Sequence, residues 1–412
     1  MIKPIPKNKD GELLRDTLTD ETFLCIRRKG LIHGLYLRGD RLIRVSADGE
    51  ALSVKGMICI AKVIDVVPNI NAIFVRLPNK TKCFIPMNDV LPECVLSDRE
   101  VPVQGDNLLV QVTKDPAKGK EASGTTVIKL EGRYCVVVPG KGEVLYSHKI
   151  SASQREQMKG IERELKSFLS PNMNIILRTK AAGVEEAICV DECKALLDEM
   201  KEHLGRALNR TEYSVLKKPM MQYQELLSEL LAQKKQIRIL AEDAELYDEL
   251  LQFVRSKFPD CEKMCKHYQD NMGSLSALFG IESRLKDAIS DKVWLKSGAF
   301  LYIEPTQAMT VIDVNSGKFD RRGEAEETFL HVNLEAAEEI VHQIILRNLS
   351  GIIVIDFINM KNHENYSRLW DKMIELLQKS GDFARLIDIT KLGLVEMTRK
   401  KTGKTIYEQI LM

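Results

Sequence analysis

The 412-residue sequence has no long hydrophobic run, and this absence excludes a helix that spans a membrane. Its longest apolar stretches, such as residues 351–355, fall far short of the ~20 residues that such a helix needs. Residues 1–9 are charged and have no apolar stretch behind them, so we expect no secretory signal. Together these absences predict a cytoplasmic protein.

The sequence also has no excess of charge of either sign. It contains 60 Lys and Arg against 59 Asp and Glu, a formal net charge of +1. Any binding of nucleic acid must therefore come from local basic patches and not from the field of the whole protein. With 44% hydrophobic and 29% charged residues, the composition is that of a folded globular protein and excludes disorder across the whole chain.

The nine cysteines are an odd number scattered along the chain, which argues against a disulfide scaffold and predicts reduced thiols. Two pairs, Cys189/Cys193 and Cys261/Cys265, would each present both thiols on one face of a helix, and His267 is close to the second pair. A zinc site could be built in that way. Cysteine is more often buried as a small hydrophobic residue, so we do not expect zinc.

The length predicts two to four domains. Alternating apolar residues and turns up to residue 54 predict a small sheet. Short β-rich runs between 57 and 113 predict a small barrel, and the polar stretch 114–124 predicts a loop. Later patterns predict strands at 134–138, 174–178, 237–240, 299–304, 308–314 and 351–359, and helices at 152–169, 185–208, 222–235, 243–257 and 324–347.

Two aspartates follow runs of β-branched residues in the last third of the chain. Asp313 follows such a run in one predicted strand, and Asp356 follows another in the next predicted strand. The helix predicted at 324–347 fits a crossover between them, so we expect the two strands to be parallel and adjacent. Both carboxylates would then leave the same edge of the sheet, where open α/β sheets bind ligands.

Paired carboxylates suit Mg²⁺, which takes one or two of them together with waters and substrate phosphates. Hydrolysis of a phosphodiester by water is the chemistry that such a site supports. Asn315, two residues after Asp313, would orient a phosphate or a metal-bound water. The pattern leaves one alternative open, because an aspartate in this position often only caps a turn or a helix.

Basic and aromatic residues add a link to nucleic acid. Lys318, Arg321 and Arg322 follow the first aspartate in a loop with glycine, as expected for contacts with an RNA backbone, although such runs are often only solvated. In the barrel segment, Phe74 and Phe84 lie on successive predicted strands among basic residues, where they could stack single-stranded bases. Either phenylalanine could instead belong to the core.

Several long motifs, in the same order, resemble those of a known family. They are Val-Trp-Leu-Lys-Ser-Gly at 293–298, Ala-Met-Thr-Val-Ile-Asp-Val-Asn-Ser-Gly-Lys-Phe at 308–319, Glu-Glu-Thr at 326–328, Asn-Leu-Glu-Ala-Ala at 333–337, Gly-Ile-Ile-Val-Ile-Asp-Phe-Ile-Asn-Met at 351–360 and Leu-Gly-Leu-Val-Glu-Met-Thr-Arg at 392–399. The region 281–399 closely resembles the catalytic region of the ribonuclease E/G family. The preceding part of the chain is collinear but less similar.

The resemblance implies a single-strand-specific endoribonuclease of RNA processing and decay, which leaves 5′-phosphate and 3′-hydroxyl ends. It implies Mg²⁺, with Mn²⁺ as a substitute, bound by Asp313 and Asp356 and supported by Asn315. The barrel resembles the family's S1 domain, an OB-type RNA-binding fold. The RNA contacts implied for that domain are stacking by Phe74 and Phe84 and backbone contacts by Lys114 and Lys120.

The resemblance also implies a pocket that recognises a 5′-monophosphate on the RNA. Its Arg-Thr pair matches Arg178 and Thr179, and Gly132, Val136 and Arg385 complete it. A guanidinium fork and a hydroxyl suit a terminal phosphate. Taken alone, Arg178 could equally form a surface ion pair of little consequence.

Three departures from the family pattern change what we expect. His148 stands at a basic position of the pocket, which would soften the preference for monophosphorylated ends or make it dependent on pH. Gln307 stands in a turn where the family commonly has an acidic residue that could tune the metal site. No Cys-Pro-x-Cys motif is found, so we expect that a homodimer would not be linked through a shared zinc.

These observations predict a multidomain α/β protein, with fold names that come from the resemblance. The parts are a split RNase H-like platform at 1–54 plus 215–280, an inserted OB-type S1 barrel at 55–120, a 5′-monophosphate sensor region at 121–214 and a DNase I-like catalytic domain at 281–412. One alternative is a non-catalytic S1-type RNA-binding protein with a degenerate metal site. A second is a scaffold that recruits other decay enzymes, although the sequence shows no long disordered tail to do so.

Overall fold

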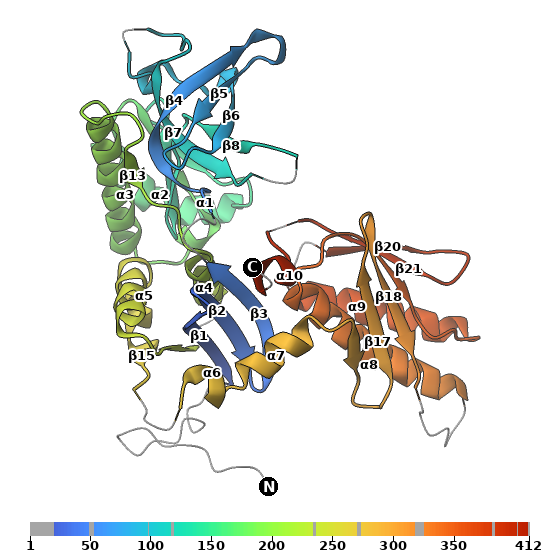
Figure 1. Cartoon of the computed structure of the whole chain (residues 1–412). Coiled ribbons are helices and arrows are strands. Elements are labelled where there is room, and N and C mark those ends of the chain that lie inside the picture. Colours follow the sequence, from blue (N-terminus) through green and yellow to red (C-terminus); the bar gives the residue numbers. More distant parts are fainter. Residues whose placement is uncertain are drawn as a thin grey trace. The chain divides into compact units, whose positions relative to one another are not determined.

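The computed structural model describes residues 20–48, 53–97, 99–116, 119–233, 236–269, 273–317, 325–380, 384–401 and 403–410. The chain divides into two compact units, with boundaries after Glu50 and after Met221. Each unit contains two sheets together with helices, so the predicted mixed α/β class is confirmed (Figure 1). None of the helices in the described ranges is long and apolar enough to cross a membrane.

One sheet of the first unit combines the N-terminal segment with a segment about half-way along the chain. Its strands, in spatial order, are β15 (Cys265–His267), β14 (Arg238–Ala241), β1 (Glu21–Arg28), β2 (Leu31–Arg38) and β3 (Arg41–Asp48). The helices of this region are α4 (Gln222–Gln233), α5 (Ala244–Lys257), η5 (Pro259–Met264), α6 (Leu275–Leu278), α7 (Ile281–Ala288) and α10 (Ile406–Ile410). Asp48 is buried and accepts hydrogen bonds from the N–H groups of Gln222 and Tyr223, which fixes the start of α4.

The second unit contains the barrel that the sequence predicts. Its strands, in spatial order, are β4 (Ile58–Val67), β5 (Ala72–Arg76), β6 (Lys82–Pro86), β8 (Ala122–Thr125) and β7 (Asn107–Lys114), and pairing of β4 with β7 closes a five-stranded, OB-like barrel. Short helices η1 (Pro68–Ile70), η2 (Met87–Asp89) and η3 (Pro92–Cys94) connect them. The predicted loop 114–124 is wrong at its end, since β8 begins at Ala122 and pairs with β6 and β7.

The rest of the second unit is an α/β layer beside the barrel. Its sheet has the order β11 (Val144–Tyr146), β12 (Met173–Leu177), β10 (Cys135–Pro139) and β9 (Leu130–Glu131), and its helices are α1 (Ala152–Gln157), α2 (Lys159–Phe168), η4 (Thr179–Ala181) and α3 (Glu186–Ala207). The single helix predicted at 152–169 is broken at buried Met158, whose ψ of 6° is not helical. β13 (Val215–Lys217) pairs with β4, so residue 215 lies with the barrel's unit and not with the platform segment assigned to it.

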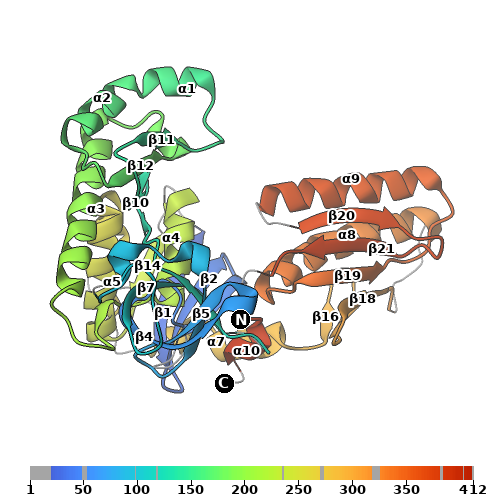
Figure 2. The same ribbon diagram turned by 90° about the horizontal axis from the view of Figure 1, so that it is seen from above.

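The second sheet of the first unit carries the two aspartates. Its strands, in spatial order, are β16 (Lys292–Trp294), β17 (Phe300–Pro305), β18 (Met309–Asn315), β19 (Gly351–Asp356), β21 (Val395–Arg399) and β20 (Ala384–Ile389). Helices α8 (Ala325–Leu346) and α9 (His363–Ser380) pack together and cover one face of it (Figure 2). The predicted crossover is confirmed, because α8 joins β18 to β19 and these two strands are parallel.

Candidate active site and RNA-binding surfaces

β18 and β19 bring Asp313 and Asp356 directly opposite each other. In the parallel register, Asp313 is the partner of Asp356. Paired residues of neighbouring strands point to the same face, and such strands lie about 4.8 Å apart. That face is the one turned away from α8 and α9, because the adjacent residues Ile312 and Ile355 are fully buried in the core under the helices. The carboxylates therefore converge on the open face of the sheet, and not beyond its edge as the sequence predicted.

The electrostatics of this pair are those of two like charges held close together. Burial and then the negative charge of Asp313 raise the pKa of the Asp356 carboxyl above its ordinary value. Asn315 donates a hydrogen bond from Nδ2 to Oδ2 of Asp313, at 2.6 Å, which fixes the orientation of that carboxylate. A bound cation would relieve the repulsion between the two carboxylates.

The donor set fits a hard divalent cation. Two carboxylates face one another, and no group of three or more His, Cys, Asp or Glu side chains in the described ranges is arranged to hold a metal. Mg²⁺ and Mn²⁺ prefer oxygen ligands, and Mg²⁺ commonly takes only one or two carboxylates. The remaining positions would be filled by water and by phosphate oxygens of a substrate.

Helix α8 holds the loop that follows β19. The side chain of Asn333 is fully buried, donates from Nδ2 to the carbonyl oxygen of Ile358 at 2.8 Å, and accepts from the N–H of the same residue at 3.0 Å. The Glu326 carboxylate accepts from the N–H of Asn362 at 2.9 Å. Both residues lie in motifs for which sequence reasoning found no role, and they act as positioning residues for the strand end that carries Asp356.

Near the end of β18, the backbones of Gly298 and Gly317 approach each other closely. Gly317, two residues after Asn315, has a φ of +60°, and a Cβ there would lie 2.6 Å from the carbonyl oxygen of Gly298. A residue other than glycine would therefore be strained in its backbone and would also collide with a neighbouring backbone atom. The turn between β16 and β17 thus packs directly against the end of β18.

In the barrel, Phe74 and Phe84 are cross-strand partners on β5 and β6. Their ring centroids lie 5.8 Å apart in an edge-to-face arrangement, and Nζ of Lys82 lies 4.1 Å from the centre of the Phe74 ring. Both rings are half-buried and outside the barrel core, which is formed by alternate residues such as Ile73 and Ile85. Aromatic faces beside a cation are suited to unpaired bases.

Lys114 and Lys120 lie on either side of the connection between β7 and β8, and both are exposed. Lys114 is the last residue of β7 and pairs with Ser123 of β8. Both ammonium groups can therefore reach solvent on the same connection, next to the strand β6 that carries Phe84.

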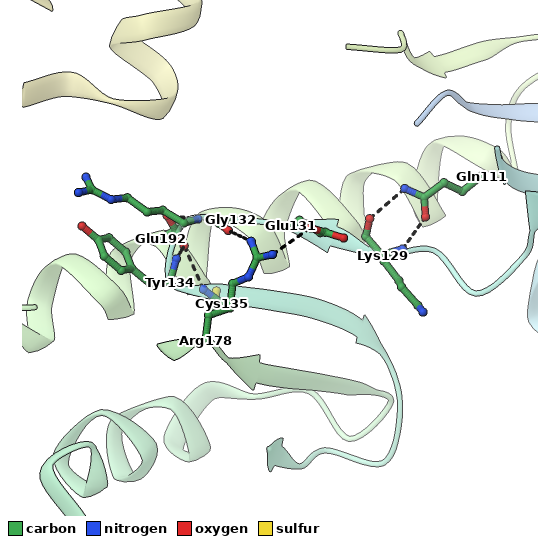
Figure 3. A network of polar contacts seen from close by, with 9 residues as sticks. Gln111, Lys129, Glu131, Gly132, Tyr134, Cys135, Arg178 and Glu192 are labelled. Carbon is green, nitrogen blue, oxygen red and sulfur yellow. Dashed lines mark hydrogen bonds and ion pairs between the residues drawn. The ribbon is translucent and has the colours of Figure 1, made fainter. Parts of the chain in front are cut away.

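In the α/β layer of the second unit, Arg178 and Gly132 are in contact (Figure 3). The guanidinium of Arg178 donates from Nη1 to the carbonyl oxygen of Gly132 at 2.7 Å and from Nη2 to Glu131 at 3.2 Å. Thr179 follows at the start of η4 and is exposed. Val136 lies on β10, opposite Glu131. Four of the five residues predicted to bind a 5′-phosphate therefore lie on neighbouring parts of this layer.

Glu192 of α3 holds the loop at Gly132 in place. Glu192 was not among the residues predicted from the sequence. Its carboxylate accepts hydrogen bonds from the N–H groups of Arg133, Tyr134 and Cys135, at 2.9, 2.7 and 3.2 Å (Figure 3). A Cβ on Gly132 would lie 2.3 Å from Oε1 of this tethered carboxylate. Gly132 is therefore required for this loop conformation, a role that no sequence pattern would have indicated.

Two further basic residues, Arg133 and Lys180, lie near Arg178. Burial and then the positive charges of Arg133 and Arg178 lower the pKa of Lys180. Nε of Arg133 is buried and has no hydrogen-bond partner among the described residues. A lysine whose pKa is lowered by burial and by two neighbouring arginines lies in a site that an anion would stabilise.

Comparison with known proteins decides the family. The family model described as "Ribonuclease E/G family" matches residues 129–402. The chain is 34% identical over 395 residues to Ribonuclease G of Escherichia coli (strain K12), which covers 90% of this chain and 78% of the relative. The chain belongs to the ribonuclease E/G family. This membership confirms the resemblance stated above and the expected class of enzyme, an endoribonuclease.

Two further relatives extend the comparison. Ribonuclease G of Haemophilus influenzae is 29% identical over 414 residues, covering 96% of this chain and 80% of the relative. Ribonuclease E of a Synechocystis species is 30% identical over 364 residues, covering 86% of this chain and 53% of the relative. The likeness thus extends beyond the matched region 129–402 toward the N-terminus.

The structure also shows where Gln307 and His148 lie, two positions at which the chain departs from the family pattern. Gln307 lies in the turn between β17 and β18, and Asp313 lies four residues along β18 from Met309, the first residue of that strand. The expectation that an acidic residue in this turn could tune the metal site stays a prediction. His148 is exposed just after β11, next to the strand that leads to Arg178.

The remaining predicted residues lie in the other unit or outside the described residues. Arg385 lies on β20, in the other unit from Arg178. Lys318, Arg321 and Arg322 lie outside the described residues.

The cysteine pairs differ in their surroundings. All nine cysteines lie among the described residues, and none of them is joined in a disulfide. Cys189 and Cys193 lie on α3 as predicted and pack in the core of the α/β layer. Cys261 and Cys265 do not share a helix face, because the first lies in η5 and the second in β15, and this prediction is wrong. His267 contacts the Glu242 carbonyl oxygen through Nε2 and stacks on Tyr247.

Proposed function

We propose that the protein is a Mg²⁺-dependent, single-strand-specific endoribonuclease that leaves 5′-phosphate and 3′-hydroxyl ends and prefers 5′-monophosphorylated RNA. The observation that carries the proposal is the register that sets Asp313 opposite Asp356 on adjacent parallel strands. Within the family to which the chain belongs, this is the arrangement that fits a catalytic divalent ion.

In the mechanism, Asp313 and Asp356 would hold the ion, with Mn²⁺ as a substitute for Mg²⁺. When bound, the ion would supply an activated water and would neutralise charge on the phosphodiester. Asn315 keeps the Asp313 carboxylate in one orientation through its 2.6 Å hydrogen bond. Asn333 and Glu326 keep the end of β19 in position. Water adds to phosphorus, the bond from phosphorus to the 3′ oxygen breaks, and that oxygen takes up a proton.

Substrate binding is assigned to the second unit. Phe74 and Phe84 would stack unpaired bases, and Lys114 and Lys120 would contact the backbone. Both rings are half-buried and meet edge to face, and Lys82 lies over the Phe74 ring. These observations support stacking. Lys318, Arg321 and Arg322, which lie outside the described residues, stay proposed contacts to the RNA backbone.

Recognition of the 5′ end is assigned to the cations around Arg178. Arg178 and Thr179 would bind the terminal phosphate, and Gly132 and Val136 would complete the part of the pocket that lies in this layer. The assignment of Arg385, which lies in the other unit, stays a prediction from the sequence. The depressed pKa of Lys180, caused by burial and by Arg133 and Arg178, supports a site that takes an anion. The Glu131 carboxylate now pairs with Arg178, and a phosphate would compete with it for the guanidinium.

The finer fold assignment belongs to the same proposal. We interpret the sheet of β1–β3, β14 and β15 as the RNase H-like platform, the barrel as an S1 domain, the layer of β9–β12 as the sensor region and the sheet of β16–β21 as DNase I-like. The proposal includes a homodimer that no shared zinc links. Light scattering beside the activity assay tests this last point.

Cleavage of a labelled single-stranded oligonucleotide tests the function. The wild-type protein with Mg²⁺ should cut it into fragments whose new 5′ ends are phosphorylated, and Asp313→Ala should bind the RNA without cutting it. Binding without cleavage by the wild-type protein would favour the alternative of a non-catalytic S1-type RNA-binding protein. Equal cleavage by wild type and Asp313→Ala would contradict the assigned site.

A further inference from the structure

The carboxylate pair is part of a row that crosses four strands of its sheet. Lys292 on β16 is the partner of Tyr302 on β17, Tyr302 is the partner of Asp313 on β18, and Asp313 is the partner of Asp356 on β19. Residues paired in this way share one face. A lysine and a tyrosine therefore lie on the same open face as the carboxylates, with Tyr302 about one strand spacing, roughly 5 Å, from Asp313.

The next row contains two more aromatic residues. Trp294 is the partner of Phe300, and Phe300 is the partner of Asn315. The ring centroids of Trp294 and Phe300 lie 5.2 Å apart, and those of Phe300 and Tyr302 lie 5.5 Å apart. The three rings thus form one continuous aromatic cluster beside the residues assigned to catalysis.

A cation is held over this cluster. Nζ of Lys292 lies 3.7 Å from the centre of the Phe300 ring and 4.0 Å from the centre of the Trp294 ring. In the described part of the chain it forms no ion pair with a carboxylate. Its charge is therefore available to a phosphate group while its contact with the rings keeps it in place.

The cluster is not required by the core of the sheet. Trp294 is 63% exposed and Tyr302 is 39% exposed. Core contacts of the same two strands come from the alternate residues, such as fully buried Leu301. A tryptophan with so much of its surface in water lies where a partner can cover it.

We propose that Trp294, Phe300 and Tyr302, together with Lys292, form a base-stacking subsite that holds an unpaired nucleotide next to the scissile phosphodiester. The inference rests on the proposed endoribonuclease function and adds a substrate contact within the catalytic unit. Base stacking is tolerant of sequence, because every base has an aromatic face, so the subsite positions RNA without selecting one base.

RNA fits the cluster better than a protein partner does. The surface is continuous, through the pair of Tyr302 and Asp313, with the carboxylates that the substrate must reach. It also repeats the chemistry of the barrel, where Phe74 and Phe84 meet edge to face with a lysine over one ring. Aromatic faces beside an ammonium group match the bases and phosphates of a single strand.

A series of single-stranded oligonucleotides tests the subsite, each with one abasic nucleotide at a different position around a single cleavage site. With the wild-type protein, kcat/KM should fall about 5- to 150-fold when the abasic nucleotide lies at the stacked position. Trp294→Ala should show a similar fall on intact RNA and no further fall with the abasic nucleotide at that position. Ile387→Ala, which alters a 55% exposed residue on the opposite edge strand, is the matched control and should behave as wild type.

Tryptophan fluorescence gives a readout that does not depend on cleavage. The chain has two tryptophans, and Trp370→Phe leaves Trp294 as the sole emitter. Its fluorescence should be quenched as the oligonucleotide binds, with a smaller effect when the stacked base is absent. Unchanged fluorescence at saturating RNA would overturn the subsite.

The outcomes separate this inference from the function on which it rests. If the wild-type protein cuts RNA and Trp294→Ala cuts it equally well, only the subsite is wrong. If the wild-type protein does not cut RNA at all, the function is wrong. A fall in activity that is the same for every abasic position, together with a smaller mass of Trp294→Ala in light scattering, would mean that a second copy covers this face and would overturn the subsite.

Discussion

Asn333 of α8 forms a reciprocal pair of hydrogen bonds with the backbone of Ile358, two residues beyond Asp356. The side chain is fully buried, so no water can replace it. The end of β19, which carries Asp356, is therefore fixed to the helix that crosses behind the sheet.

Replacing Asn333 with Ala should lower the free energy of unfolding by about 1–3 kcal/mol, because both backbone groups of Ile358 lose their partner in a buried place. Cleavage should fall as well, with RNA affinity unchanged. Urea unfolding and single-turnover cleavage measure the two effects. Asn359→Ala, which alters an exposed residue of the same loop, should leave stability near wild type, and an equal loss in both variants would contradict the role of Asn333.

The raised pKa of Asp356 predicts how stability depends on pH. Burial and the charge of Asp313 raise the pKa of the folded state above that of the unfolded chain. The folded state therefore binds the proton more tightly, and this contribution to stability is present at low pH and lost as pH rises through the folded pKa. In the absence of divalent cations, Asp356→Asn should increase the free energy of unfolding at neutral pH and change it little below the ordinary pKa of an aspartate.

Urea unfolding at the two pH values checks this prediction, with Asp371→Asn, an exposed aspartate on α9, as the control. Added Mg²⁺ should stabilise the wild-type protein and not Asp356→Asn. A loss of stability in Asp356→Asn at neutral pH without divalent cations would mean that the two carboxylates do not repel each other in the folded protein.

Arg178→Ala should remove any difference in cleavage rate between RNA with a 5′-monophosphate and RNA with a 5′-hydroxyl. Charge-assisted hydrogen bonds contribute about 1.5–3 kcal/mol, so the loss for the monophosphorylated substrate should be about tenfold or more. Glu131→Gln removes the carboxylate that competes for the guanidinium and should increase the preference. Arg206→Ala on α3 is the control, and a preference that persists in Arg178→Ala would remove the assignment.

Phe74→Ala should weaken binding of single-stranded RNA by about 1–3 kcal/mol, because it removes one stacking face. Fluorescence anisotropy with a labelled oligonucleotide measures the affinity. Ile70→Ala alters a residue of the same barrel that is 56% exposed and outside the aromatic pair, and it should bind like wild type. Equal affinities of all three proteins would place Phe74 among residues that only support the barrel.

The elements that the sequence predicted correctly are those whose apolar residues repeat with one clear period. β18 and α8 were found within one residue, and β19 was found with the correct start and an end three residues too late, because runs of β-branched residues flank a helix with one apolar stripe. β1 was missed because Thr22 to Ile26 are buried in succession, as expected for a strand covered on both faces, and no alternation remains to be read. α9 carries Leu369, Met373 and Leu377 at intervals of four, a signal that could have revealed it.

The pairing of Asp313 with Asp356 was predictable for a similar reason, since both lie near the ends of recognisable strands. The residues that hold the site were not. Asn333 and Glu192 are polar residues on helices and look like solvated positions in the sequence. Only tertiary packing decides that one is buried against Ile358 and that the other accepts three backbone N–H groups around Gly132.

Binding of Mn²⁺ followed by electron paramagnetic resonance tests most directly whether Asp313 and Asp356 together hold one divalent ion. The wild-type protein should bind one ion per chain at this pair. Asp313→Asn and Asp356→Asn should each weaken that binding by about tenfold or more, since each removes one of only two charged ligands. Full Mn²⁺ affinity in either single variant would show that the two carboxylates do not share an ion and would contradict the assigned active site.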